Sequence, residues 1–191
     1  MQILDTKKLT RQKWLNLFRR RFQHNGREGT WIFASRRAKP YARATSCDAV
    51  VIVPIVIEPG QPNRVVVIRE YRVTLEAYEF TFPAGLVEPD EPIEQAIRRE
   101  LKEETGLELA EVTSLSPATY SSSGLSDETA AVAFVKARKL PGAVPELQDS
   151  EIIEMQELDF DQVCRLCETQ EPINGRSWCI LNMYRQLGEI R

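Results

Sequence analysis

Histidine and cysteine are both scarce in this chain, and their scarcity narrows the chemistry available to it. The 191 residues include one histidine, His24, which argues against a Ser–His or Cys–His nucleophilic mechanism. The four cysteines are too few for a secreted disulfide scaffold of this size. Cys164 and Cys167 have the spacing of a zinc or redox pair, but no second pair follows and both fall within an expected helix. We therefore expect the cysteines to be structural.

Long apolar segments and a strong net charge are also missing. No apolar run approaches the length of a transmembrane helix, and the polar, basic N-terminal segment lacks the pattern of a signal peptide. The net charge of −3 provides no basic footprint for a nucleic-acid polymer. These absences predict a cytoplasmic protein that has neither a membrane nor a nucleic-acid polymer as its partner.

The chain does contain enough apolar sequence for one substantial domain. Hydrophobic residues make up 42% of it, and its length suits a single domain with a small N-terminal extension. We expect residues 1–45 to form an N-terminal arm or strand region and residues 46–191 to form the main domain. Within the extension, residues 6–22 fit either a short amphipathic helix or an extended arm, and residues 30–35 fit a strand.

Runs of β-branched residues and helical patterns share the main domain. Strands are expected at residues 47–58, 64–71, 78–83, 112–118, 129–139 and 152–158, and helices at residues 91–105, 160–167 and 177–187. The turn residues 59–63 join the first two strands into a hairpin, and residues 141–150 form an acidic loop. Asp90 is the expected N-cap of the first helix, and Gly106 ends it. The pattern predicts an α/β fold with a mixed sheet.

Three closely spaced carboxylates mark the first expected helix. Glu100 and Glu104 are four residues apart and share one helix face, which Glu103 flanks. Two unit charges about 4 Å apart repel by roughly 4 kcal/mol at an effective dielectric near 20, so a cation would relieve this cluster. Hard oxygen ligands suit Mg²⁺ above all. From the acidic spacing alone, a charged surface helix with Arg–Glu pairs fits equally well.

The residues around these glutamates extend the pattern. Residues 85–107 read Gly-x5-Glu-x7-Arg-Glu-Leu-x-Glu-Glu-x-Gly-Leu. This stretch resembles the Nudix box, and every fixed position of that signature is filled. The resemblance implies an α/β/α sandwich fold with a mixed sheet. It also implies hydrolysis of a nucleoside diphosphate linked to another moiety, with Mg²⁺ as the cofactor and Mn²⁺ as an alternative.

The resemblance assigns roles to individual residues of the box. The metal ligands that it implies are the carbonyl of Ala84 and the side chains of Glu100, Glu103 and Glu104. Glu103 is also a candidate catalytic residue, and so is Arg99, which orients the glutamates. Gly85 lets the backbone approach the site without a Cβ in the way. Glu91 fills a box position for which we expect a structural role.

A further acid outside the box is expected to help activate water. Glu151 best matches a loop glutamate that precedes a strand in the family. A general base must reach the water and have a suitable pKa, and a sequence shows neither. Glu154, Asp149 and a wholly solvated acidic loop are therefore the alternatives to Glu151.

Residues upstream and downstream of the box resemble the ADP-ribose pyrophosphatase branch of the family. An arginine that matches Arg72 contacts the diphosphate there, a role that suits a planar guanidinium; a solvated arginine at a strand end is the alternative. The loop at 121–128 contains a matching Gly-Leu-Ser, which includes Ser126 as a candidate substrate ligand. Ser123 stands where that branch commonly has a proline, sixteen residues after Leu107. This departure leaves GDP-mannose, UDP-glucose or another sugar nucleotide open beside ADP-ribose.

The N-terminal strand supplies candidates for recognition of the base. Trp31 and Phe33 alternate so that they share one strand face, and Arg36 follows them. An aromatic face can stack on a nucleobase, although core packing is the commoner role of such residues. In the ADP-ribose branch this region often crosses between subunits and helps form the base pocket. The resemblance therefore implies a homodimer.

Three functions are consistent with these residues. The first is cation-dependent hydrolysis of a nucleoside diphosphate sugar, such as ADP-ribose, to a nucleoside monophosphate and a sugar phosphate. The second is a non-catalytic module that binds a nucleotide sugar, which the complete set of box carboxylates disfavours. The third is hydrolysis of dinucleoside polyphosphates or nucleoside triphosphates, against which the context of Arg72 and the long N-terminal segment argue.

Overall fold

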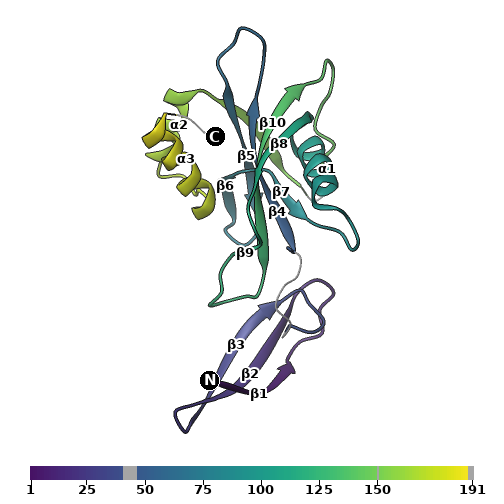
Figure 1. Ribbon diagram of the computed structural model, residues 1–191, viewed down its shortest axis with the longest axis vertical. Helices are drawn as coiled ribbons and strands as arrows, with labels where there is room; N and C mark the ends of the chain where they lie inside the picture. Colours follow the sequence, from purple (N-terminus) through teal and green to yellow (C-terminus); the bar gives the residue numbers. More distant parts are fainter. Residues whose placement is uncertain (41–46, 150, 189–191) are drawn as a thin grey trace. The chain divides into compact units, whose positions relative to one another are not determined.

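The computed structural model describes residues 1–40, 47–149 and 151–188 (Figure 1). The chain folds into two compact units, one formed by residues 1–48 with 118–130 and the other by residues 49–117 with 131–191. The expected domain boundary between residues 45 and 46 lies outside the described residues, as does the last residue of the loop expected at 141–150. The division into residues 1–45 and 46–191 therefore stays a prediction.

The first unit is built on a three-stranded antiparallel sheet. Its strands are β1 (Gln2–Lys8), β2 (Asn16–His24) and β3 (Arg27–Ser35), in the order β1-β2-β3. The helix alternative for residues 6–22 is wrong, because Phe18 pairs with Phe33 across β2 and β3 and both rings are buried. Asn25 and Gly26 both have positive φ (50° and 73°), which is the geometry of a two-residue hairpin turn. This Asn-Gly pair fixes the register of β2 on β3.

Residues 118–130 belong to the same unit, although they are distant in sequence. Ala34 of β3 donates its N–H to the carbonyl of Leu125 at 2.8 Å. Arg37 binds Asp48 through two hydrogen bonds, of 3.1 and 2.7 Å, and the same carboxylate accepts the N–H of Thr129. The short strand β9 (Thr119–Tyr120) pairs with residues 129–130. β3 therefore holds the loop that follows β9.

The second unit has a sheet with helices on both faces (Figure 1). Its strands are β4 (Ala49–Val56), β5 (Arg64–Arg72), β6 (Ala77–Thr81), β7 (Ala84–Leu86), β8 (Leu107–Leu115), β10 (Thr129–Lys139) and β11 (Ile153–Leu158). The order is β11-β5-β4-β10-β8, with β6 on β5 and β7 on β4. Helix α1 (Ile93–Thr105) packs on β8 and β4, whereas α2 (Phe160–Cys167) packs on β11 and α3 (Gly175–Leu187) on β6.

The sheet is mixed, as predicted. β4 and β5 form the expected antiparallel hairpin, in which Ile55 pairs with Val65. β4 and β10 run in the same direction, because Asp48 bonds to Thr129 and Ile57, further along, bonds to Ala137. With helices on both faces, the predicted α/β/α sandwich is confirmed.

A core of aliphatic side chains joins α1 to the sheet. Ile97 and Leu101 of α1 are fully buried against residues of β4, β8 and β10. Burying a side chain of this size contributes about 1.5–3 kcal/mol relative to leaving it in water. The apolar stripe of the helix thereby fixes the orientation of the glutamates that flank it.

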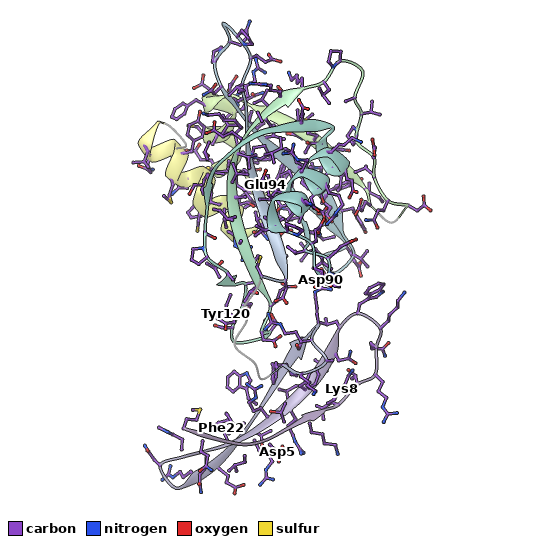
Figure 2. All side chains as sticks on the ribbon, turned by 45° about the vertical axis from the view of Figure 1, so that its right-hand side comes forward. Asp5, Lys8, Phe22, Asp90, Glu94 and Tyr120 are labelled. Carbon is purple, nitrogen blue, oxygen red and sulfur yellow. The ribbon has the colours of Figure 1, made fainter. Side chains whose placement is uncertain are left out.

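Most expected elements are present, but the start of α1 and the strand after it differ from the prediction. Pro92, and not Asp90, is the N-cap of α1; Asp90 has a positive φ of 63° and lies ahead of the helix, and Glu94 lies in its first turn (Figure 2). Gly106 ends the helix as predicted, with its N–H bonded to Lys102. β8 begins at Leu107, five residues before the expected start, because alternation resumes directly after the glycine. β7 is too short to have been expected.

Among the described residues, no helix is both long enough and apolar enough to cross a membrane.

Candidate active site

Gly85 brings the backbone of β7 against a carboxylate of α1. Gly85 pairs with Val50 of β4, which places β7 beside the helix. A Cβ on Gly85 would lie 1.9 Å from the carboxylate of Glu100. With any other residue at position 85 the Glu100 carboxylate would have to move away, so glycine allows Glu100 to rest against this strand in the observed position. The role expected for Gly85 is confirmed.

Glu100 and Glu104 are both buried on the face of α1 that meets β7. Glu100 is 8% exposed and Glu104 is 5% exposed. Glu104 accepts a hydrogen bond from the backbone N–H of Ala84 at 3.0 Å. Burial raises the pKa of the Glu104 carboxyl to about 9, and the nearby carboxylates act in the same direction; these belong to Glu100, Glu70 and Glu151. The site therefore concentrates acidic groups that cannot easily all be charged without a cation.

Arg99 fixes the neighbouring glutamates. Its Nη1 donates to Glu100 at 2.6 Å and to Glu103 at 3.5 Å. Its other donors bind both carboxylate oxygens of Glu91, each at 3.0 Å, and the carbonyl of Leu86. This hydrogen bonding lowers the pKa of Glu91. Glu91 thus anchors Arg99, in agreement with a structural role.

The oxygen atoms that this site offers are ligands of the kind that a hard divalent cation prefers. Glu100 and Glu104 supply buried carboxylate oxygens, and the backbone of β7 approaches them at Gly85. Within residues 1–40, 47–149 and 151–188, no three acidic, histidine or cysteine side chains already stand as a metal-ligand set. Arg99 binds two of the glutamates in this structure. The ligand set of Ala84, Glu100, Glu103 and Glu104 therefore stays a prediction.

Glu151 lies close enough to affect the carboxylates of α1. Its charge raises the pKa of Glu70, Glu100 and Glu104. It accepts a hydrogen bond from the N–H of Gln148 at 2.9 Å. Glu154 instead pairs with Arg69, at 3.5 Å. Among the acids considered from the sequence, the structure thus brings Glu151 toward the box.

Arg72 lies at the end of β5 between two carboxylates. Its Nη1 donates to Glu70 of β5 and its Nε donates to Glu79 of β6 at 3.3 Å. Burial raises the pKa of Glu70, which lies beside the charges of Arg72 and Glu151. Sequence reasoning missed Glu70 and Glu79. The available signal for Glu70 was its place two residues before Arg72, on the same side of a strand.

The residues expected to bind the base all belong to the first unit. Trp31 is 54% exposed, and its indole N–H donates to the carbonyl of Gly124 at 3.1 Å. Phe33 is buried and stacks on Phe18, with 5.9 Å between ring centroids, which is the core-packing alternative. Ser126 forms a parallel bridge with Ala34. The carboxylates of α1 belong to the second unit, so a shared base pocket stays a prediction.

Arg36 binds an acid of the same loop. Its Nε donates to a carboxylate oxygen of Glu128 at 3.0 Å. Both side chains are partly exposed, so this ion pair contributes little to stability. Arg36 thus contacts the loop within the first unit, and its role in substrate binding stays a prediction.

Known proteins resemble this chain in sequence and in fold. The NUDIX domain model matches residues 47–178. ADP compounds hydrolase NudE of Escherichia coli (strain K12) is 40% identical over 92 residues, which is 46% of this chain and 47% of that protein. ADP-sugar pyrophosphatase of Mus musculus is 32% identical over 64% of this chain and 55% of its own length. ADP-ribose pyrophosphatase of Saccharomyces cerevisiae (strain ATCC 204508 / S288c) is 30% identical over 74% of this chain and 62% of its own length.

A solved structure supports the fold. The crystal structure of an ADP compounds hydrolase aligns with a TM-score of 0.72 at 24% identity and covers 96% of this chain and 91% of that chain. At this identity the likeness concerns the fold alone. The chain spans between about half and two thirds of the length of the curated relatives named above. The matched domain covers more than half of the chain and contains the complete box, and the chain therefore belongs to the NUDIX family.

Proposed function

We propose that this protein hydrolyses the pyrophosphate linkage of a nucleoside diphosphate sugar, with ADP-ribose as the first candidate. The observation that carries the proposal is the pair of buried carboxylates, Glu100 and Glu104, packed against β7 at Gly85. The named relatives, which act on ADP compounds and ADP-sugars, support the choice of substrate class. A cytoplasmic location and a homodimeric state complete the proposal.

In this proposal the acidic cluster holds a divalent cation, Mg²⁺ or Mn²⁺. The residues that would hold it are the carbonyl of Ala84 and the side chains of Glu100, Glu103 and Glu104. A bound cation of this kind offsets the charge of phosphoryl oxygens and favours the ionisation of water. Arg99, through its contacts with Glu100 and Glu103, keeps these carboxylates oriented.

The remaining charged residues act on the substrate and on water. Arg72 binds oxygens of the diphosphate, for which a guanidinium is suited by its planar set of donors. Glu151 accepts the proton of the water that attacks one phosphorus in line. The bond from that phosphorus to the bridging oxygen breaks, which releases a nucleoside monophosphate and a sugar phosphate. Trp31 and Phe33, with Arg36 and Ser126, are the candidates for contact with the base and sugar.

A substrate panel tests the proposal. ADP-ribose, GDP-mannose and UDP-glucose are incubated with Mg²⁺ or Mn²⁺, and release of the nucleoside monophosphate is measured. We expect Glu103→Gln to lower kcat on the order of 100-fold because it removes a charged ligand. Glu108→Gln, which alters an exposed glutamate of β8, is the matched control and should leave kcat unchanged.

Two results would contradict the proposal. Binding of ADP-ribose without cation-dependent release of AMP would indicate a non-catalytic binding module. Turnover confined to dinucleoside polyphosphates or nucleoside triphosphates would place the enzyme in another substrate class.

A further inference from the structure

Two acidic side chains oppose each other across β5 and β6. Glu70 pairs directly with Glu79 in the antiparallel register, and each side chain is only 15% exposed. Like charges at directly opposed positions of a sheet repel and destabilise the strand pair. Such a pair is stable only if a nearby positive charge offsets the repulsion between the two carboxylates.

Arg72 compensates both charges with one guanidinium. It lies two residues beyond Glu70 on the same strand, and its Nη1 and Nε bind the two carboxylates. A guanidinium has five N–H donors, of which the carboxylates take two. Within the described chain the other three have no hydrogen-bond partner, and the side chain is 37% exposed. Arg72 is thus held at Nε and Nη1, and both N–H groups of its Nη2 are left for a ligand.

We propose that Glu79, together with Glu70, forms a cradle that positions Arg72 for the diphosphate of the substrate. This inference rests on the proposed function, because it uses Arg72 as the residue that contacts the diphosphate. A long arginine side chain loses rotational freedom when it binds an anion. Two fixed carboxylates remove much of that freedom beforehand, so that the free donors already point in one direction. Glu79 is a positioning residue, since it acts on the substrate only through Arg72.

Glu79 is the better member of the cradle to alter. The charge of Glu70 also raises the pKa of Glu104, a predicted metal ligand. A substitution of Glu70 would therefore alter both the support of Arg72 and the predicted metal site. Glu79 makes its hydrogen bond to Arg72 and, among the described residues, to no other side chain. A change at Glu79 therefore isolates the cradle from the carboxylates of α1.

Steady-state kinetics with ADP-ribose tests the cradle. Glu79→Ala should raise KM roughly 5- to 10-fold with little change in kcat, because it weakens binding that substrate and transition state share. Glu79→Gln keeps an acceptor oxygen for Arg72 and should recover part of this loss. Glu171→Gln, which removes an exposed partner of the adjacent Arg69, is the matched control and should leave KM unchanged.

A double-mutant cycle separates positioning from a general structural effect. In an Arg72→Ala background, Glu79→Ala should raise KM no further, because Glu79 acts on the substrate only by positioning Arg72, which that background lacks. An equal rise in both backgrounds, or no rise in either Glu79 variant, overturns the cradle. If Glu79→Ala fails to fold, the same cycle is run with Glu79→Gln.

The cradle can fail separately from the proposed function. Turnover of nucleoside diphosphate sugars by the wild type, with KM unaffected at Glu79, overturns the cradle alone. If the wild type turns over none of these sugars, the proposed function fails, and calorimetric binding of inorganic pyrophosphate then decides the cradle. Weaker pyrophosphate binding in Glu79→Ala than in the wild type supports it. Equal binding, or no binding to the wild type, overturns it.

Discussion

Glu104 combines burial, a backbone hydrogen bond and several acidic neighbours in one side chain. Its carboxylate accepts the N–H of Ala84, which favours the charged form, yet burial dominates and raises its pKa to about 9. Glu100 and Glu151 add to the rise because each is a like charge. A metal ligand must be deprotonated, so the same features that suit Glu104 to a cation make its charge unfavourable when no cation is bound.

Glu104→Gln should therefore stabilise the metal-free protein at alkaline pH. A carboxyl whose folded-state pKa is raised contributes stability fully below its unfolded-state pKa, and this stability is lost as pH rises toward the folded-state value. The free energy of unfolding of the variant should exceed that of the wild type by roughly 1–3 kcal/mol at pH 8. The difference should be smaller at pH 5. Urea titrations of chelator-treated protein at both pH values check this. A variant that is less stable than the wild type by the same amount at both pH values contradicts this prediction. Added Mg²⁺ should stabilise only the wild type.

Helices and strands whose apolar residues follow one clear periodicity were predictable from the sequence. Segments that fit both the helical and the strand periodicity were not. β10 and α2 have the bounds expected from the sequence, because burial alternates over residues 131–138 and Asp159 forms a capping box with Gln162. Residues 6–22 fitted a helix as well as an extended chain, and only pairing with β3 decides between them. Asp90 has the side chain of an N-cap but a positive φ, so the turn before Pro92 excludes it from that role.

The left-handed conformation of Gly106 ends α1 directly before β8, so replacement of Gly106 should destabilise the protein. Gly106 has φ 70°, and a Cβ there would lie 3.1 Å from the backbone of Val144. Gly106→Ala should lower the free energy of unfolding by about 1–2 kcal/mol through the left-handed conformation alone. Gly60→Ala is the matched control, since Gly60 has φ 75° and open space around it. Urea unfolding should show a larger loss for Gly106→Ala, and equal losses would mean that the contact with Val144 relaxes freely.

At the scale of the whole molecule, the box was visible in the sequence, whereas its surroundings depend on strand order. Gly85, Arg99 and the glutamates of α1 lie within one continuous stretch, so the resemblance of that stretch to the Nudix box predicted a common site. Glu70 and Glu79 meet because β5 pairs with β6, and the antiparallel pairing of β11 with β5 brings the strand that follows Glu151 alongside Glu70. The pairing of β11 with β5 joins segments that are distant in sequence, and no local pattern in the sequence encodes it.

The first unit leaves large apolar side chains of β3 exposed, and the proposed homodimer can be tested there. Trp31 and Ile32 are consecutive residues of β3 and are 54% and 57% exposed, so each face of the strand carries an exposed large apolar side chain. Single exposed apolar residues are common on monomers, so the proposed homodimer rests on the family resemblance, and these side chains are the place to test it. We expect light scattering to give a mass about twice the 21.9 kDa of the chain. Ile32→Asp should shift the mass toward the monomer, whereas Leu187→Asp, at a position of α3 that is 68% exposed, should not. A wild-type mass of one chain at working concentrations would contradict the homodimer.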